Sequence, residues 1–255
     1  MIDLLALDFD GVICNGLLEY FETARRAYCQ IWSTQGELEQ WRSFFYQLRP
    51  VVETGWEMPV VIHALASGVT AEEILTDWPD RRDHLVKASG VTPPEIGQCV
   101  DQLRDQWISQ DLAGWLSLHS FYPGVVERLN QVLAQGIPTY IISTKEKRFI
   151  LQLLQQAGVN FPAEQVFGKE CDRPKSAILL DLLPAGKIWF IEDRWLTLTK
   201  IAALSQLESV ELFLADWGYN TEPMRQAAQA HPRIHLLSLG QFSQDFTAWD
   251  SNLNP

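Results

Sequence analysis

Short apolar runs alternate with segments of helical spacing through the second half of the chain. Five of these runs are predicted as strands, at 138–143, 165–167, 187–191, 210–214 and 234–237. Between them, apolar residues recur at helical spacing, and glycine or proline stands near several segment ends. Strands and helices that alternate in this way predict a parallel sheet that is covered on both faces. The final stretch, 243–255, is polar and is expected to fray.

The beginning of the chain combines one more predicted strand with a long helical segment. The apolar run 4–7 is predicted as a buried strand, because it is short, continuous and closed by a turn signal. Residues from about 16 to 120 instead carry helical spacing and many Gln, Trp and charged side chains. Thr70 with Glu73 forms a predicted capping box, and Thr92 begins a further predicted helix.

These elements predict an α/β fold with two domains. The first is a Rossmann-like parallel-sheet core domain made of residues 1–15 and 121–255. The second is an all-helical cap domain, residues 16–120, inserted just after the first strand. Ligands of such sheets bind beyond the carboxyl ends of the strands. An insertion at this point is therefore expected to act as a lid that excludes water.

Composition and charge narrow the possible functions. The chain has 255 residues and is 47% hydrophobic, with 10 Trp and 12 Phe, so it can bury a sizeable core. Its net charge of -12 argues against nucleic acid as a partner, because affinity for nucleic acid depends on clustered Lys and Arg. No apolar run approaches the ~20 residues that cross a bilayer, and no signal segment begins the chain. We expect no membrane partner, a cytoplasmic location, and ordinary thiols for the 4 cysteines, which lack zinc-ligand spacing.

Two carboxylates, Asp8 and Asp10, follow the first predicted strand one residue apart, and Gly11 comes directly after Asp10. Acidic groups at the end of a buried strand are costly unless a cation or a reaction uses them. Strand periodicity points both side chains to the same side, and Gly11 lets the backbone turn sharply or approach a ligand closely. Taken alone, an ordinary Asp-Gly turn explains this segment equally well.

Three further polar groups lie at or near predicted strand ends. Ser143 and Thr144 close the run that begins at 138, where hydroxyls and backbone N–H groups can grip an anion. Lys175 could offset charge on a phosphoryl group, and Glu192 with Asp193 closes a second buried strand. Each group has an ordinary alternative when taken alone: N-capping hydroxyls, a solvated lysine, and a capping pair at a βα turn.

Together these groups have a chemical logic. Carboxylates from two strand ends form a hard-oxygen site that suits Mg²⁺, which prefers few protein ligands together with water and phosphate. One aspartate is left to attack phosphorus, as carboxylate nucleophiles do. A hydroxyl and a lysine can then stabilise the transferring phosphoryl group. The set therefore predicts a phosphoryl-transfer site.

The segment Asp8-Phe9-Asp10-Gly11-Val12, Ser143, Lys175 and the pair Glu192-Asp193, in this order, resemble the four motifs of the haloacid dehalogenase superfamily of hydrolases. The resemblance covers about 1–16 and 120–240. In its place and helical character, the insertion is similar to the cap of the phosphoglycolate phosphatase and β-phosphoglucomutase branch. The resemblance implies a Mg²⁺-dependent phosphatase that hydrolyses a small phosphorylated metabolite through an aspartyl-phosphate intermediate.

The resemblance also implies a role for each motif residue. Asp8 would be the nucleophile, and Asp10 the general acid/base that protonates the leaving group and then activates water. Lys175 would neutralise charge between the phosphate and the nucleophile. The expected phosphate contacts are Gly11, Ser143, Thr144 and Lys175. The expected metal ligands are Asp8, the backbone carbonyl of Asp10, Asp193 and, as a helper, Glu192.

The fourth motif departs from the pattern of many relatives, which have Gly before the metal-binding Asp and another acid four or five residues later. Here Glu192 replaces that Gly, and Thr197 and Leu198 occupy the later positions. This departure implies a rearranged metal site with weaker or altered Mg²⁺ binding. Two alternatives stay open: a phosphomutase of the same family, and a catalytically weak protein that kept the fold to bind a metabolite or a partner.

Overall fold

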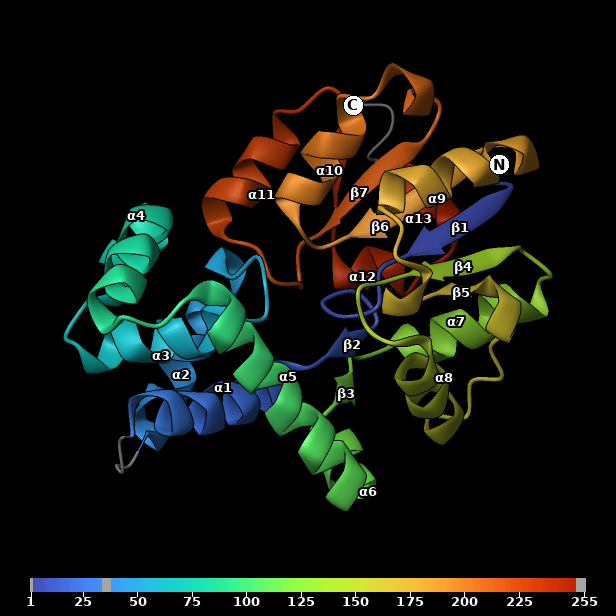
Figure 1. Ribbon diagram of the computed structural model, residues 1–255. Helices are drawn as coiled ribbons and strands as arrows, with labels where there is room; N and C mark the ends of the chain where they lie inside the picture. The colour runs from blue at the N-terminus through green and yellow to red at the C-terminus, as the bar shows by residue number, and fades with distance from the viewer. Residues whose placement is uncertain (1, 34–37, 251–255) are drawn as a thin grey trace. The chain divides into compact units, whose positions relative to one another are not determined.

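The computed structural model describes residues 2–33 and 38–250, and the chain forms two compact units. The core unit consists of Met1–Asn15 and Ser120–Pro255, and the helical unit of Gly16–His119 (Figure 1). The chain leaves the core unit after Asn15 and returns at Ser120. Both parts of the core unit are therefore needed to complete one sheet.

A six-stranded sheet with the order β5-β4-β1-β6-β7-β8 forms the centre of the core unit. All neighbouring strands in it are parallel, which confirms the predicted α/β fold. Its strands are β1 (Leu4–Leu7), β4 (Thr139–Ile142), β5 (Val166–Phe167), β6 (Ile188–Glu192), β7 (Glu211–Ala215) and β8 (Ile234–Leu237). A separate antiparallel pair joins β2 (Cys14–Asn15) to β3 (Ser120–Phe121).

The strand β1 lies at the centre of the sheet, between β4 and β6. Leu7, at its carboxyl end, is in register with Ile141 of β4 and Ile191 of β6. The three parallel strands therefore end at the same edge of the sheet, where the polar residues that follow them emerge.

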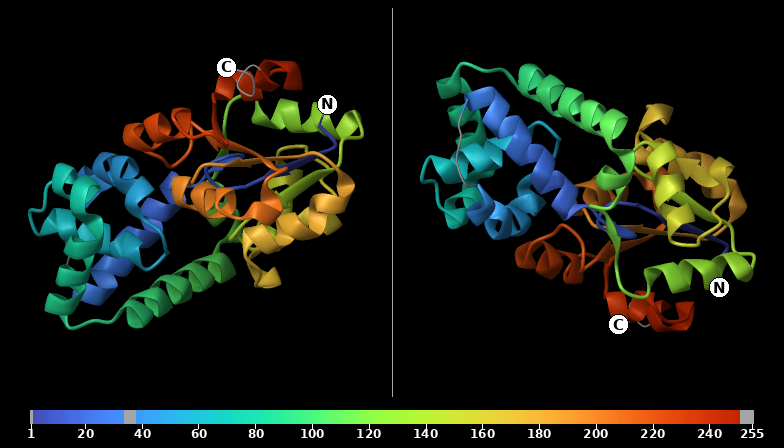
Figure 2. Two further views of the ribbon diagram at one scale, coloured as in Figure 1. Left: turned by 90° about the horizontal axis from the view of Figure 1, so that it is seen from above. Right: turned by 90° about the horizontal axis from the view of Figure 1, so that it is seen from below.

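Helices cover both faces of the sheet (Figure 2). The helices of the core unit are α7 (Val125–Ala134), α8 (Lys147–Gln156), α9 (Lys175–Leu182), α10 (Trp195–Ala202), α11 (Glu222–Gln229), α12 (Leu239–Phe242) and α13 (Phe246–Asp250). On one face, Phe190 of β6 packs with Ile178 of α9 and Leu198 of α10. Trp189 points to the other face, because successive strand residues alternate, and there it stacks on Trp249 of α13 with ring centroids 5.6 Å apart.

One expectation from the sequence, that the last residues fray, is wrong for part of the stretch. The polar stretch 243–255 is expected to fray, but Phe246–Asp250 forms the helix α13. Trp249 is completely buried, and its Nε1 donates a hydrogen bond of 2.7 Å to the carbonyl oxygen of Gln241. The burial of this large indole outweighs the polar composition of its surroundings. The rest of the stretch, 251–255, lies outside the described residues.

The helical unit contains α1 (Leu17–Trp32), α2 (Arg42–Leu48), α3 (Glu57–Ala66), α4 (Ala71–Ser89), α5 (Pro93–Gln110) and α6 (Leu112–Leu116). Two helix starts are confirmed by their caps. Glu73 Oε2 accepts a hydrogen bond from Thr70 N before α4, and Glu95 Oε2 accepts one from Thr92 N before α5. Across 2–33 and 38–250, no helix combines the length and the apolar character that crossing a membrane requires.

Candidate active site

Asp8 follows β1 directly and lies at the centre of the candidate site. Its backbone N–H extends the sheet by donating to Ile191 O at 2.9 Å. The carboxylate Oδ1 accepts a hydrogen bond of 2.7 Å from Phe9 N, and Oδ2 lies 2.9 Å from Lys175 Nζ. Burial raises the pKa of Asp8 to about 7, although the Lys175 ammonium partly offsets this rise. Asp8 is therefore a buried carboxylate with a positive charge beside it.

The loop after Asp8 folds tightly and brings its backbone against Asp193. Phe9 O accepts hydrogen bonds from Ile13 N at 2.9 Å and from Cys14 N at 2.8 Å. Gly11 has a φ of +87°, and a β-carbon at this position would overlap the Asp193 carboxylate. Both the backbone conformation and the lack of space therefore require glycine here. The phosphate contact expected of Gly11 stays a prediction.

Asp10 forms a largely buried ion pair with a residue that sequence reasoning missed. Asp10 Oδ1 lies 3.2 Å from Lys145 Nζ, and the two side chains are 14% and 8% exposed. Water screens a pair at such a position only weakly, so the ammonium restricts where the Asp10 carboxylate can lie. Lys145 directly follows Ser143 and Thr144, and its place at the end of a predicted strand is the signal that could have found it.

Ser143 and Thr144 form the turn at the end of β4. Ser143 is buried, and its N–H donates to Phe167 O at 2.9 Å. Its Oγ accepts a hydrogen bond of 3.2 Å from Lys145 N, a local turn in which a hydroxyl binds the backbone two residues on. The hydroxyl proton is then still available for another acceptor. Thr144 is exposed, and the phosphate contacts of both residues stay predictions.

Lys175, the first residue of α9, joins two carboxylates. Its Nζ lies 2.9 Å from Asp8 Oδ2 and 2.7 Å from Glu192 Oε2. Burial alone would lower the pKa of Lys175, but the charges of these two acids raise it above its ordinary value. Glu192 is fully buried, and its Oε1 accepts hydrogen bonds from Asp193 N and Arg194 N at 3.1 and 3.0 Å. Glu192 thus caps the turn after β6 and also holds Lys175 against Asp8.

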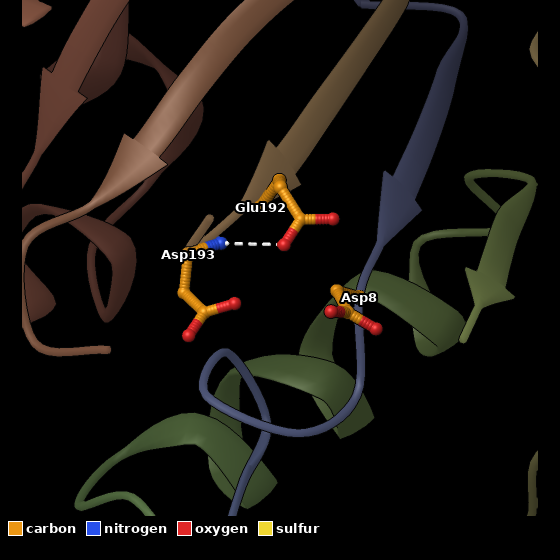
Figure 3. A group of neighbouring side chains, drawn as sticks. All are labelled: Asp8, Glu192 and Asp193. Carbon is orange, nitrogen blue, oxygen red and sulfur yellow. Dashed lines mark hydrogen bonds between the residues drawn. The ribbon is translucent and has the colours of Figure 1, made fainter. Parts of the chain in front are cut away.

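Asp8, Glu192 and Asp193 provide carboxylate oxygens that lie within 4.8 Å of one another (Figure 3). All three residues are buried, and they come from the carboxyl ends of β1 and β6. Oxygen donors of this kind suit Mg²⁺ and other hard divalent cations. With Asp10, these acids exceed the two lysines described above by two negative charges when all are ionised. The residues therefore fit the predicted metal, whose charge would also lower the pKa of Asp8.

The helix after β6 adds no acid to this cluster. Thr197 and Leu198 lie in α10, which contains no Asp or Glu. Leu198 is fully buried among apolar side chains and so contributes to the core instead. The weaker or altered Mg²⁺ binding that this departure implies stays a prediction.

The chain matches a known protein family. The family model of haloacid dehalogenase-like hydrolases covers residues 2–196, which include all the acids and lysines of the site. The chain therefore belongs to the haloacid dehalogenase-like hydrolases, as the order of its motifs predicts. A comparison with curated proteins gives no match.

Solved structures of distant relatives share the fold. A protein named as a haloacid dehalogenase-like hydrolase from Bacteroides fragilis is 20% identical, with a TM-score of 0.58 over 94% of this chain and 99% of that chain. A predicted phosphoglycolate phosphatase from Haemophilus somnus is 16% identical, with a TM-score of 0.55 over 87% and 88% of the two chains. A protein named as a β-phosphoglucomutase from Thermotoga maritima is 16% identical, with a TM-score of 0.53 over 95% and 97%. These likenesses confirm the fold class.

The loop after β7 also contacts the site and was missed by sequence reasoning. Tyr219 N donates a hydrogen bond of 2.7 Å to Asp193 Oδ2. The run predicted as a strand at 210–214 is followed by a segment that contains Asp216, Gly218 and Asn220, and the carboxyl ends of such strands are where ligands bind. That rule, applied to this strand as well, would have pointed to the loop.

Proposed function

We propose that this hydrolase is a phosphatase that acts on a small phosphorylated metabolite, with Asp8 as its nucleophile and Mg²⁺ as its cofactor. The metal would be held by Asp8, the backbone carbonyl of Asp10 and Asp193, with Glu192 as a helper. The observation that carries the proposal is the position of Asp8, between a buried lysine 2.9 Å away and a cluster of acids suited to a divalent cation. Phosphoryl transfer depends mainly on positioning and charge stabilisation, and these groups supply both.

In the first step, a carboxylate oxygen of Asp8 attacks the phosphorus of the monoester. The bond between phosphorus and the ester oxygen breaks, and its electron pair leaves with that oxygen. Asp10, in its protonated form, donates a proton to the leaving oxygen and releases an alcohol. Lys175 offsets the charge on the phosphoryl oxygens, which Ser143 contacts through its hydroxyl. The product on the protein is an aspartyl-phosphate.

In the second step, water attacks the phosphorus of the aspartyl-phosphate. Asp10, now ionised, accepts a proton from that water, and the bond between phosphorus and the Asp8 oxygen breaks. Inorganic phosphate is released and the Asp8 carboxylate is restored. When bound, Mg²⁺ would supply further positive charge against the phosphoryl oxygens.

The phosphoenzyme itself is the most direct test. The full chain is mixed with Mg²⁺ and para-nitrophenyl phosphate carrying labelled phosphorus, and the reaction is stopped in acid. We expect steady release of phosphate by the wild-type protein and no label on Asp8→Asn. Asp10→Asn should accumulate labelled aspartyl-phosphate. The para-nitrophenolate leaving group needs no proton, so the first step can proceed, whereas the attack of water in the second step still needs Asp10 as a base.

Asp3→Asn is the matched control for these variants. Asp3 lies at the opposite end of the same strand, where its Oδ2 accepts a hydrogen bond from Lys187 N. Turnover by this variant should equal that of the wild-type protein. The proposal fails if the wild-type protein releases no phosphate from a panel of phosphorylated metabolites, or if Asp8→Asn turns over normally. A burst of sugar bisphosphate from a sugar monophosphate would instead indicate a phosphomutase.

A further inference from the structure

The loop after β7, residues 216–220, folds tightly against the end of β1. Gly218 N donates to Ala215 O at 3.2 Å, and Asn220 N donates to Gly218 O at 3.0 Å. Trp217 Nε1 donates a hydrogen bond of 3.0 Å to Val12 O, in the loop that follows Asp10. The 216–220 loop belongs to none of the four motifs, yet it contacts the segment that carries the first of them.

The same loop donates two hydrogen bonds to Asp193. Tyr219 N donates to Asp193 Oδ2 at 2.7 Å, and Asn220 Nδ2 donates to the backbone oxygen of Asp193 at 3.1 Å. One bond orients the carboxylate and the other fixes the backbone from which it extends. Asp193, Tyr219 and Asn220 are all buried, so water cannot easily replace either bond.

The side-chain amide of Asn220 forms further hydrogen bonds through both its nitrogen and its oxygen. Nδ2 donates a second hydrogen bond, of 2.7 Å, to Ala215 O. Oδ1 accepts one of 3.0 Å from Arg225 Nη1, which also donates to the backbone oxygen of Asn220 at 3.1 Å. The donor that reaches Asp193 therefore belongs to a side chain with a fixed rotamer.

Gly218 allows the loop to come this close. A β-carbon at position 218 would overlap the Asp193 side chain and lie 2.5 Å from Gly11 O. At position 11, likewise, a β-carbon would overlap the Asp193 carboxylate. Two glycines, from two different loops, thus confine the same carboxylate.

We propose that the 216–220 loop is a positioning element of the metal site, and that it orients the Asp193 carboxylate for Mg²⁺. The inference rests on the proposed function, because it takes Asp193 as a metal ligand. Groups that hydrogen-bond a metal ligand typically change metal affinity by ten- to a hundredfold when they are lost. The loop acts through Asp193, which accepts its hydrogen bonds.

Direct measurement of Mg²⁺ binding tests the role of the loop. The dissociation constant of Mg²⁺ is measured by calorimetry on the full chain and on Asn220→Ala, Gly218→Ala and Arg225→Met. We expect Asn220→Ala and Gly218→Ala to raise it roughly ten- to a hundredfold. Arg225→Met leaves Asn220 in place but removes its support, so a smaller rise is expected. This variant decides the test if the other two do not fold.

Thr221→Ala is the matched control. Thr221 Oγ1 accepts a hydrogen bond of 3.4 Å from Met224 N and so caps α11, one residue beyond the loop. This variant should lower the melting temperature without changing the dissociation constant. Folded Asn220→Ala that binds Mg²⁺ like the wild-type protein would overturn the inference and leave the phosphatase proposal intact. If Asn220→Ala and Gly218→Ala do not fold, the same result for Arg225→Met would overturn it. A wild-type protein that binds no Mg²⁺ overturns both, and one that binds Mg²⁺ but releases no phosphate overturns only the phosphatase.

Discussion

Both units of the chain bury carboxylates, but they compensate these charges in different ways. In the helical unit, Glu19 is fully buried and accepts hydrogen bonds from Thr23 Oγ1 at 2.7 Å and Trp115 Nε1 at 3.1 Å. Arg104 Nε lies 2.9 Å from the same carboxylate. Glu57, also in this unit, is surrounded in a similar way by Thr54, Trp78 and Arg82. Each of these acids has its own cation and its own donors, as burial of a charge requires.

In the core unit, acids crowd together at the carboxyl ends of the central strands, and two of them share one lysine. Asp8 and Glu192 both contact Lys175, and Asp10 contacts Lys145. Burial raises the pKa of Asp8, and the charge of nearby Glu192 adds to this rise against the opposing effect of Lys175. Groups with displaced pKa values concentrate at functional sites. Because both sets of acids are buried, burial alone does not mark a functional acid. Crowding of acids at the strand ends is the feature that distinguishes the core set, and we expect these acids to be the functional ones.

Of the changes that test this difference between the two units, Asp8→Asn is expected to have the largest effect, which is on kcat. Loss of the nucleophile should lower kcat by roughly four orders of magnitude. The melting temperature should stay equal or rise, because one charge leaves an overcrowded acidic cluster. Steady-state phosphate release and thermal unfolding measure the two quantities. A strong loss of stability in this variant would mean that Asp8 is a structural acid like Glu19, and the comparison would fail.

Glu19→Gln, in the helical unit, is expected to lower stability and to leave kcat nearly unchanged. This change leaves Arg104 without its counter-ion, so the free energy of unfolding should fall by about 3 kcal/mol. The kcat of the folded protein should change little. Urea unfolding provides the measurement, with Glu39→Gln as control. Glu39 is 61% exposed in its pair with Arg42, and an exposed pair of this kind contributes at most about 1 kcal/mol. A collapse of kcat at unchanged stability would show that Glu19 belongs to the functional acids.

The comparison also shows which features the sequence reveals. The strand that carries Asp8 and the one that carries Asp193 are short apolar runs closed by acids, a local pattern that needs no knowledge of the rest of the fold. Parallel strands bring such ends to one edge, so the meeting of Asp8 with Glu192 and Asp193 follows from the order of the elements. The place of Lys175 beside Asp8 is expected only from the resemblance to the family. The fold class and the family are confirmed, while the individual residue roles, the cytoplasmic location and the absence of nucleic-acid partners stay predictions.

The features that the sequence hides depend on contacts between distant segments. The pair of Asp10 with Lys145 and the bond from Tyr219 N to Asp193 arise only once the loops after β1, β4 and β7 are in place. The helix α13 is hidden for a related reason. This helix has five residues, among them Thr, Trp and Asp, which favour a helix only weakly, and the burial of Trp249 against Trp189 stabilises it.

Addition of Mg²⁺ provides a third test, because a divalent cation is expected to bind among the crowded acids of the core unit. A cation that binds only the folded protein should stabilise it by about 2.7 kcal/mol at a hundred times its dissociation constant. For a chain of this length, this corresponds to roughly 5–10 °C in the melting temperature. EDTA should reverse the shift, and Asp193→Asn should abolish it. Glu57→Gln, in the helical unit, should keep the full shift although it starts from a lower melting temperature. An equal shift in Asp193→Asn would place the cation elsewhere.

The smallest expected effect concerns Lys145, the cation that faces Asp10. Lys145→Met should lower kcat by roughly tenfold with little change in KM, because an Asp10 carboxylate without its partner takes the required position less often. Lys145→Arg should restore much of the rate, since a guanidinium can still pair with the carboxylate. Lys147→Met is the matched control, because Lys147 lies two residues further on, at the start of α8. If the Lys145 and Lys147 variants behave alike, Lys145 only compensates charge, in the way that Arg104 does for Glu19. A loss specific to Lys145 that arginine rescues would instead place it among the residues that position the reacting groups.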